Sequence, residues 1–270
     1  MANIKISIIN SSTVLTDSEV KAVVPALQTQ VSRDFAPAWG IDADLTFVPK
    51  GSKPSASSWW LVVLDNSDQA GALGYHDITS DGLPIGKIFA GSDIQYGYNW
   101  TVTASHELLE MLGDPDINLT VFVQDSDTSG ILYAYETADA CEADEYGYKI
   151  DGVLVSDFVF PSWFEPMAKK GRQYDFRKKI KKPFHLLKGG YIGVFDVTYG
   201  GGWQQKTAEH APVAYGARPH VGSRRERRRT PKDQWLRSRP DAGQPHKAGA
   251  PTTAALKALV FLPATAASAR

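Results

Sequence analysis

The sequence predicts a mixed α/β fold, in which helices pack on a twisted and partly parallel sheet. Apolar patterns with the periods of strands and helices alternate along the first part of the chain. The 270 residues are 43% hydrophobic, so the chain can bury a core of domain size. Further along, the composition turns acidic and then basic. We therefore expect one domain over residues 1–210, followed by a tail over residues 211–270 that is basic, then Ala/Pro-rich, and largely disordered.

The first part of the chain predicts the order strand, helix, strand, strand. MANIKISIIN alternates polar and apolar residues, which is typical of a strand. TDSE, residues 16–19, has the form of a capping box, and apolar residues at helical spacing follow it as far as Pro37. ADLTFVP, from Ala43, alternates as a strand. WWLVVLDN, from Trp59, is a dense apolar run expected at the centre of a sheet.

The next elements surround a second predicted helix. Residues 71–90 are rich in Gly and Asp, and we expect a loop there with a short strand at PIGKIFA. Residues 99–112 are predicted to form a helix that Asp114-Pro115 ends. After an acidic stretch over residues 125–151, KIDGVLVSDFVFP predicts a hairpin with Asp151-Gly152 at its turn. GGYIGVFDVTYGGGW predicts a final strand.

The tail contains a dense basic segment. RPHVGSRRERRRTPKDQWLRSRP, residues 218–240, holds nine Lys or Arg residues against two carboxylates. Such a cluster is the electrostatic footprint of contact with an anionic partner, here through Arg224–Arg229. No nucleic-acid-binding module accompanies it, so a solvated tail, or an arm docked on the acidic stretch, remains an alternative.

The cysteine content and the hydropathy bear on location. Cys141 is the single cysteine, so no intramolecular disulfide can form. The carboxylates around it are expected to raise the pKa of its thiol and make it unreactive. The N-terminus lacks the pattern of a signal peptide, and no apolar run has the length of a membrane span. We expect a cytoplasmic location, or export without an N-terminal signal peptide.

SHELLEMLGDPD, residues 105–116, carries the chemistry on the second predicted helix. His106 and Glu110 are four residues apart, so their side chains leave the same helix face one turn apart. Two ligands at this spacing can bind one metal ion while the adjacent Glu107 acts on a bound water. The alternative is an amphipathic helix whose solvent-exposed face carries the same three residues as ordinary surface groups.

Two further features distinguish these interpretations. Gly113 and Asp116 extend the motif to His-Glu-x-x-Glu-x-x-Gly-x-x-Asp. It resembles the extended zinc signature of the metzincin metallopeptidases, in which a glycine bends the chain, commonly with positive φ, and returns a third ligand to the metal. Met167, in PSWFEPMAKKG, resembles the methionine turn that metzincins place beneath the metal. The resemblance covers residues 4–167 and implies a metzincin-like twisted mixed sheet with an active-site helix.

The resemblance implies a metalloendopeptidase whose substrate is a peptide or a protein. His106, Glu110 and Asp116 would hold Zn²⁺, and Glu107 would take a proton from the metal-bound water as general base and later protonate the leaving amine. Glu110 replaces the second His of the usual signature. An extra carboxylate weakens the Lewis acidity of the ion and shifts the preference towards harder ions such as Mn²⁺ or Ca²⁺.

Several alternatives stay open. His76, Glu136 and Glu142 are further candidate ligands, or else solvated loop residues. A serine nucleophile is not predicted, because Ser105 precedes His106 on the same helix and points elsewhere. The rival to an enzyme is a non-catalytic structural or binding protein that retains a metzincin-like scaffold and offers its basic arm to an anionic partner.

Overall fold

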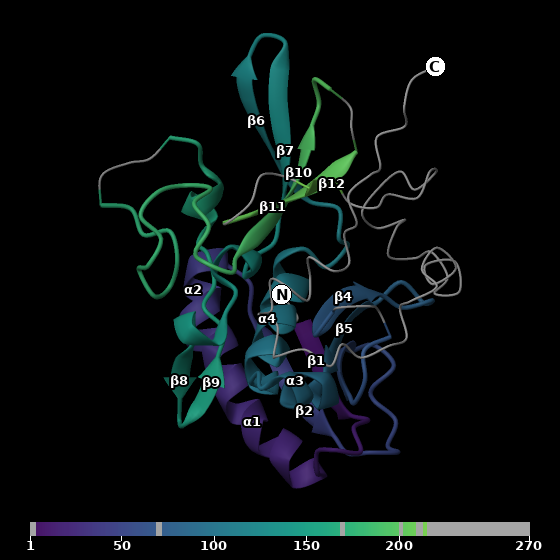
Figure 1. The fold of residues 1–270 in the computed structure, drawn as a ribbon. Helices are drawn as coiled ribbons and strands as arrows, with labels where there is room; N and C mark the ends of the chain where they lie inside the picture. Colours follow the sequence, from purple (N-terminus) through teal and green to yellow (C-terminus); the bar gives the residue numbers. More distant parts are fainter. Residues whose placement is uncertain (1–3, 69–71, 168–170, 200–201, 209–212, 215–270) are drawn as a thin grey trace.

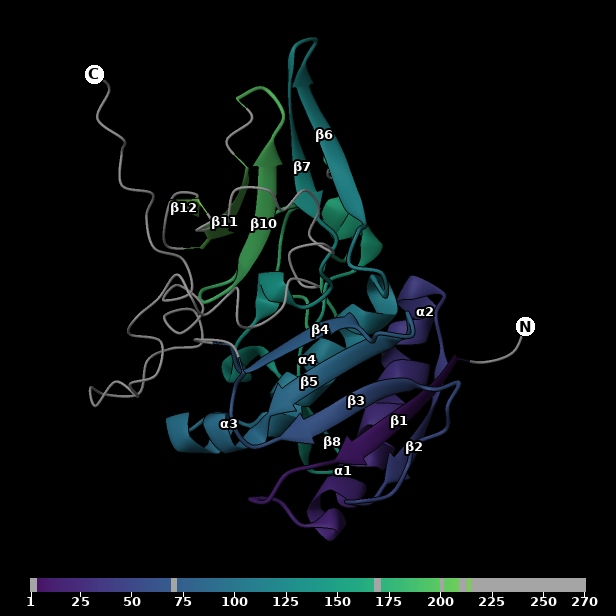
Figure 2. The same ribbon diagram turned by 90° about the vertical axis from the view of Figure 1, so that its right-hand side faces the viewer.

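A computed structural model describes residues 4–68, 72–167, 171–199, 202–208 and 213–214 of the chain. The N-terminal half forms a five-stranded sheet in the order β2-β1-β3-β5-β4 (Figures 1 and 2). The edge strand β4 is antiparallel to β5, and the other neighbours run parallel. The strands are β1 (Ile4–Asn10), β2 (Ala43–Val48), β3 (Trp59–Leu64), β4 (Gly74–Ile78) and β5 (Pro84–Phe89). The predicted mixed α/β class is confirmed.

Helix α1 (Asp17–Thr29) packs on this sheet, with Val20, Val23 and Leu27 buried against it. The predicted capping box is present: the Glu19 backbone N–H donates to the Thr16 hydroxyl, and the Glu19 carboxylate accepts from the Thr16 backbone N–H. A π-helical turn (Gln30–Phe35) and α2 (Ala36–Trp39) continue α1, so the helical segment ends close to the predicted position.

Helix α4 (Trp100–Gly113) is the central helix of the fold. It follows the short helix α3 (Ala90–Tyr96) and packs on β4 and β5. Figure 2 shows α1 and α4 behind the strands of the sheet. Every residue from Ala104 to Gly113 is buried, so the helix is enclosed on all sides over its second half. Polar side chains there are held inside the protein rather than on a wet face, which excludes the amphipathic surface helix considered above.

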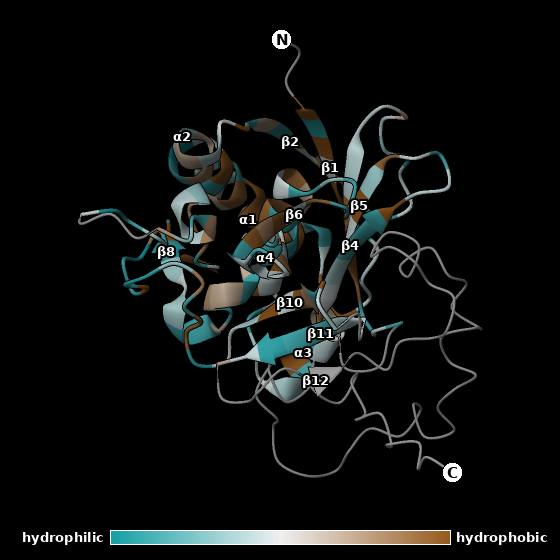
Figure 3. Ribbon diagram, turned by 90° about the horizontal axis from the view of Figure 1, so that it is seen from above, coloured by the Kyte–Doolittle hydropathy of each residue, from teal (hydrophilic) through white to brown (hydrophobic). Residues whose placement is uncertain are grey.

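A second, antiparallel sheet follows in the order β12-β11-β10-β7-β6. Figure 1 shows the β6–β7 hairpin projecting from the body of the protein, and β11 is hydrophilic (Figure 3). The strands are β6 (Thr120–Ser126), β7 (Ser129–Ala134), β10 (Tyr191–Asp196), β11 (Trp203–Thr207) and β12 (Val213–Ala214).

Between β7 and β10 the chain forms short elements. The strands β8 (Tyr148–Ile150) and β9 (Val153–Val155) form the predicted hairpin, whose turn residues Asp151 and Gly152 have φ of 48° and 88°. Three 3₁₀ turns complete this region, at Asp139–Cys141, Asp144–Tyr146 and Pro161–Phe164.

Several elements differ from the sequence prediction. β11 and β12 follow β10, which was predicted to be the final strand. Residues 74–78 are the strand β4 and not a loop, residues 90–96 form α3, and residues 120–134 form a hairpin inside a stretch where no strand was predicted. The strands among them are short or polar, and pairing with a neighbouring strand supplies the regularity that their own sequence lacks. The predicted tail falls almost entirely outside the described residues, as do the boundary near residue 210 and Arg224–Arg229. Within the described ranges, no helix has the length and apolar character required to cross a membrane.

A buried carboxyl pair, Asp157 and Asp175, ties the chain after β9 to the core. Asp157 Oδ1 accepts hydrogen bonds from the backbone N–H groups of Phe158 at 2.8 Å and Arg177 at 3.1 Å. Burial, the charge of Asp175 and a hydrogen bond with it raise the pKa of Asp157 to about 9. Because the raised pKa favours the protonated acid in the folded state, the stabilisation is complete below about pH 4 and is lost as the pH rises towards 9.

Asp157→Asn is therefore expected to reduce the change of stability with pH. The amide can donate a hydrogen bond to Asp175 at every pH, as the protonated acid does. The melting temperature of the variant minus that of the wild type should increase between about pH 5 and about pH 9. Thermal unfolding with a chelator present in every sample measures it. A difference that does not change with pH would contradict the raised pKa of Asp157.

Candidate metal centre

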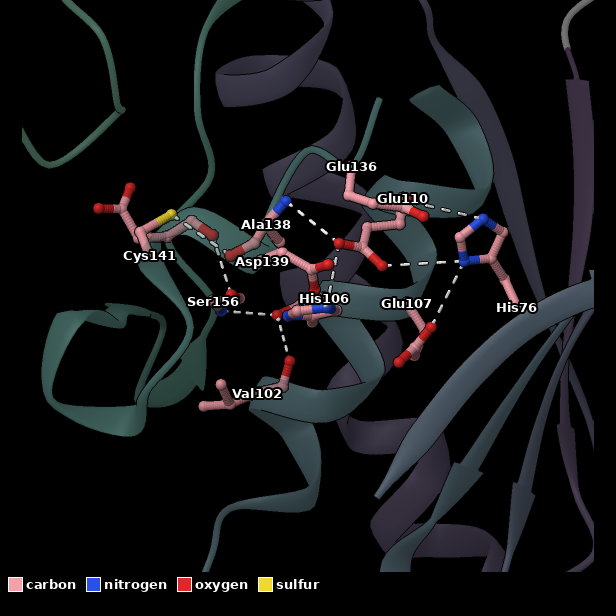
Figure 4. Close-up of polar contacts among 12 residues, drawn as sticks. His76, Val102, His106, Glu107, Glu110, Glu136, Ala138, Asp139, Cys141 and Ser156 are labelled. Carbon is pink, nitrogen blue, oxygen red and sulfur yellow. Dashed lines mark hydrogen bonds and ion pairs between the residues drawn. The ribbon is translucent and has the colours of Figure 1, made fainter. Parts of the chain in front are cut away.

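The buried half of α4 presents three side chains of metal-ligating type, His106, Glu107 and Glu110. His106 Nε2 lies 3.1 Å from Glu110 Oε1, which is the same-face geometry that the four-residue spacing predicts. The same nitrogen lies 3.2 Å from Oδ1 of Asp139, which begins the 3₁₀ turn after β7. A helix and a turn thus bring two carboxylate oxygens to one imidazole nitrogen (Figure 4).

A second imidazole, His76, enters from the edge strand β4. It is fully buried, and its Nδ1 lies 3.6 Å from Glu107 Oε2 and 3.8 Å from Glu110 Oε2. Its Nε2 lies 3.9 Å from Glu136 Oε2. Figure 4 shows Glu110 between the two imidazoles. The interpretation of His76, Glu136 and Glu142 as solvated loop residues is wrong, since all three are buried.

The segment that carries Glu136 and Asp139 packs closely against the end of α4, at Gly113. A Cβ on Gly113 would lie 2.5 Å from Thr137 Cγ2, so the glycine lets this segment pack on the end of α4. The Ala138 backbone N–H donates to Glu110 Oε1 at 3.4 Å. Gly113 has no positive φ, so the expected glycine bend is corrected: the residue is needed for packing and not for a left-handed turn.

Asp116 and Met167 differ from the metzincin pattern. Asp116 is exposed, so its carboxylate does not lie with the buried side chains around His106. The turn after α4 is held instead by buried Asp114, whose carboxylate accepts from the backbone N–H groups of Asn118 and Leu119. Met167 is 77% exposed, so it does not form the buried floor that the resemblance implies. Asp139 occupies the position beside His106 that Asp116 was predicted to take.

Ser105, which was not predicted to be a nucleophile, has a structural role. Its hydroxyl donates to the Val102 carbonyl at 3.0 Å and accepts from the Ser156 backbone N–H at 2.6 Å. The bond from Ser156 fastens α4 to the chain after β9, and the two bonds use the hydroxyl of Ser105 for structure.

The site is strongly acidic and dry. Its five carboxylates and two imidazoles are each less than 9% exposed: His76, His106, Glu107, Glu110, Glu136, Asp139 and Glu142. The negative charge of these carboxylates also acts on a neighbouring side chain, Tyr191. Burial raises the pKa of the Tyr191 phenol well above its ordinary value, and the charges of Asp139, Glu142 and Glu110 add to the increase. A divalent cation would offset the cost of burying these carboxylates.

The donor atoms fit a metal ion. Two groups of three, His106–Glu107–Glu110 and His76–Glu110–Glu136, each offer ligand atoms that lie within 4.8 Å of one another. Ligand atoms about 2.1 Å from a tetrahedral zinc ion are roughly 3.4 Å apart. The 3.1 Å and 3.2 Å separations around His106 Nε2 are close to that value. Imidazole with carboxylate ligands suits Zn²⁺ and also harder ions such as Mn²⁺.

A pocket gives access to one side of the site. His106 and Glu107 line it together with Glu142, Tyr98, Thr103 and Gly74, and its free volume, open mouth included, is about 350 Å³. The adjacent acid and imidazole of the motif therefore face a space that a small group can enter.

Gly74→Ala is expected to disturb this wall. The added Cβ would lie 2.7 Å from Glu107 Cγ and 2.8 Å from Thr103 Cγ2, so β4 and α4 must separate. We expect a loss of about 1–3 kcal/mol of unfolding free energy and weaker metal binding. Gly130→Ala on β7 is the control, because its Cβ would meet the exposed ring of Phe122 on the β6–β7 hairpin, away from the site. Equal metal affinity in both variants would contradict a role for Gly74 in placing Glu107.

Sequence analysis identified His106, Glu107 and Glu110, but it did not assign Asp139 a role. A usable signal was the spacing Glu136-x-x-Asp139-x-x-Glu142 soon after the motif, a run of potential ligands at regular intervals. Comparisons of the chain with protein-family models, curated proteins and solved structures found no match. Its function therefore has to be inferred from the residues of the site.

Proposed function

We propose that the protein is a metal-dependent hydrolase, and specifically a metallopeptidase that acts on a peptide or protein substrate. The observation that carries this proposal is His106, flanked by Glu110 and Asp139 at its Nε2 and followed in sequence by Glu107, on the wall of a pocket. His106, Glu110 and Asp139 would hold the ion, with Zn²⁺ as the first candidate and Mn²⁺ or Ca²⁺ as alternatives.

The scaffold supports the proposal in part. A mixed sheet with one antiparallel edge strand, and a buried helix that carries the motif, are compatible with a metzincin-like arrangement. The third ligand and the methionine depart from the metzincin pattern. The proposal therefore concerns the chemistry of the site more than membership of that group.

When bound, the ion would polarise the scissile carbonyl and make a water molecule a better nucleophile. The residues of the chain supply the proton transfers. Glu107 takes the proton of the attacking water as its oxygen bonds to the carbonyl carbon, and it then delivers that proton to the nitrogen as the C–N bond breaks. Burial of Glu107 beside His106 keeps this carboxylate at the pocket wall and limits competing water.

Glu107→Gln is the test. The amide cannot accept the water proton, so hydrolysis of labelled casein should fall by about 10²- to 10⁴-fold while the metal content stays unchanged. Glu145→Gln, at an exposed position, is the control and should keep full activity. A metal-bound wild type without hydrolytic activity would instead favour the non-catalytic scaffold with its basic arm, Arg224–Arg229, for an anionic partner. A Glu107→Gln variant of undiminished activity would remove Glu107 from the role of general base.

A further inference from the structure

The carboxylate of Glu110 faces two different imidazoles with its two oxygens. Oε1 lies 3.1 Å from His106 Nε2, and Oε2 lies 3.8 Å from His76 Nδ1. The two groups of converging ligand atoms share Glu110 and no other residue. Glu110 is thus the link between a His106 side and a His76 side (Figure 4).

The His76 side has its own ligands. The ring is fully buried on β4 and has carboxylate oxygens on both nitrogens, from Glu107 and Glu110 at Nδ1 and from Glu136 at Nε2. A neutral imidazole donates from one nitrogen only, so a carboxylate oxygen that faces the other nitrogen requires a proton or a metal ion between them. Three carboxylates around one imidazole are the surroundings of a cation.

The charge of the site points the same way. If both imidazoles are neutral and all five buried carboxylates are ionised, one divalent ion leaves three negative charges inside the protein, and two divalent ions leave one. Uncompensated buried charge is costly, so the second ion removes most of the remaining penalty.

A glutamate is also the type of residue that can hold two metal ions side by side. A carboxylate has two oxygens and can bind one ion with each, whereas a neutral imidazole has a single lone pair on one nitrogen. Ions in two-metal hydrolytic sites lie about 3.5–4 Å apart, a separation that a carboxylate spans. The presence of Glu110 where a one-metal signature has His is then a requirement of the site.

We propose a second divalent-cation site formed by His76, Glu136 and Glu110 Oε2, with Glu110 bridging it to the ion held by His106 and Asp139. The inference rests on the proposed function, because it places the second ion beside the first. The ligands, one imidazole with carboxylates, fit Mn²⁺ and Zn²⁺. Glu107 lies between the two sides and keeps its role as the base at the pocket wall.

The stoichiometry of binding tests it. Chelator-stripped full-length chain is dialysed against Mn²⁺ or, separately, Zn²⁺, and the bound metal is measured. We expect two ions per chain in the wild type and in the exposed control Glu145→Gln, one in Glu136→Gln, and exchange-coupled EPR lines from the Mn²⁺ pair of the wild type.

The outcomes separate the two proposals. One ion in the wild type, with uncoupled EPR lines, overturns the second site and leaves the proposed function standing, whereas no bound ion overturns both. Two ions that Glu136→Gln retains overturn the assignment of its ligands. If Glu136→Gln does not fold, His76→Gln replaces it, and the wild-type stoichiometry and EPR still decide whether a pair exists.

Discussion

His106→Ala is expected to abolish binding of the ion beside Asp139 and to remove the stabilisation that the ion provides. His106 is the imidazole at which Glu110 and Asp139 converge, and no other imidazole among the described residues faces Asp139 at that position. A ligand that binds only the folded state stabilises it by about 4 kcal/mol when its concentration is 1,000 times Kd. For a chain of this size, the melting temperature of the variant should be roughly 8–16 °C lower than that of the metal-loaded wild type.

Thermal unfolding with and without added Zn²⁺ measures the effect. With added Zn²⁺ the variant should melt well below the wild type, and any response to Zn²⁺ that it retains should come from the His76 side alone. His185→Ala is the matched control, because His185 is exposed and outside the site. A variant that still takes up the wild-type amount of metal and responds to it like the wild type would remove His106 from the ligand set.

Glu110→His is expected to convert the centre from two ions to one. The imidazole restores the ligand pair of the usual zinc signature and lowers the negative charge of the site, so the ion beside His106 should be held at least as tightly and act as a stronger Lewis acid. The bridge to His76 is lost, because a neutral imidazole cannot bind both ions. Peptidase activity that needs one ion should survive, and activity that needs both should disappear.

Metal content and casein hydrolysis, measured on the same preparation, check this outcome. Glu110→Gln is the companion variant: it keeps the size and the oxygen that accepts from Ala138, but it removes the charge. It should lower the affinity for both ions. If Glu110→His binds no zinc at all, the side chains of α4 do not converge on a common point. The similarity to the zinc signature would then be one of sequence alone and not of function.

The sequence was sufficient where local chemistry determines the structure. The capping box at Thr16 and Glu19 and the turn at Asp151-Gly152 depend on residues adjacent in the chain, and both are confirmed. The strand β4 depends on pairing with β5, and two of its residues, Gly74 and Asp77, are of types depleted in strands, so it was not predicted.

In the candidate site, too, the residues close together in the sequence could be predicted and those brought together by packing could not. His106, Glu107 and Glu110 lie on one helix, so their spacing alone predicts that they converge. Asp139 and His76 reach them only through the packing of the segment after β7 and the pairing of β4. Asp116, close in sequence to the helix, is exposed because buried Asp114 takes the structural position in the turn.

The central claim is that the buried imidazoles and carboxylates around Glu110 hold a divalent metal ion. Elemental analysis of the purified full-length chain, with thermal unfolding before and after chelation, tests it most directly. Bound transition metal that chelation removes, together with a fall of several degrees in melting temperature that added Zn²⁺ or Mn²⁺ reverses, is the predicted result. A chain that contains no metal, takes up none on dialysis and melts at the same temperature with or without chelator would contradict it.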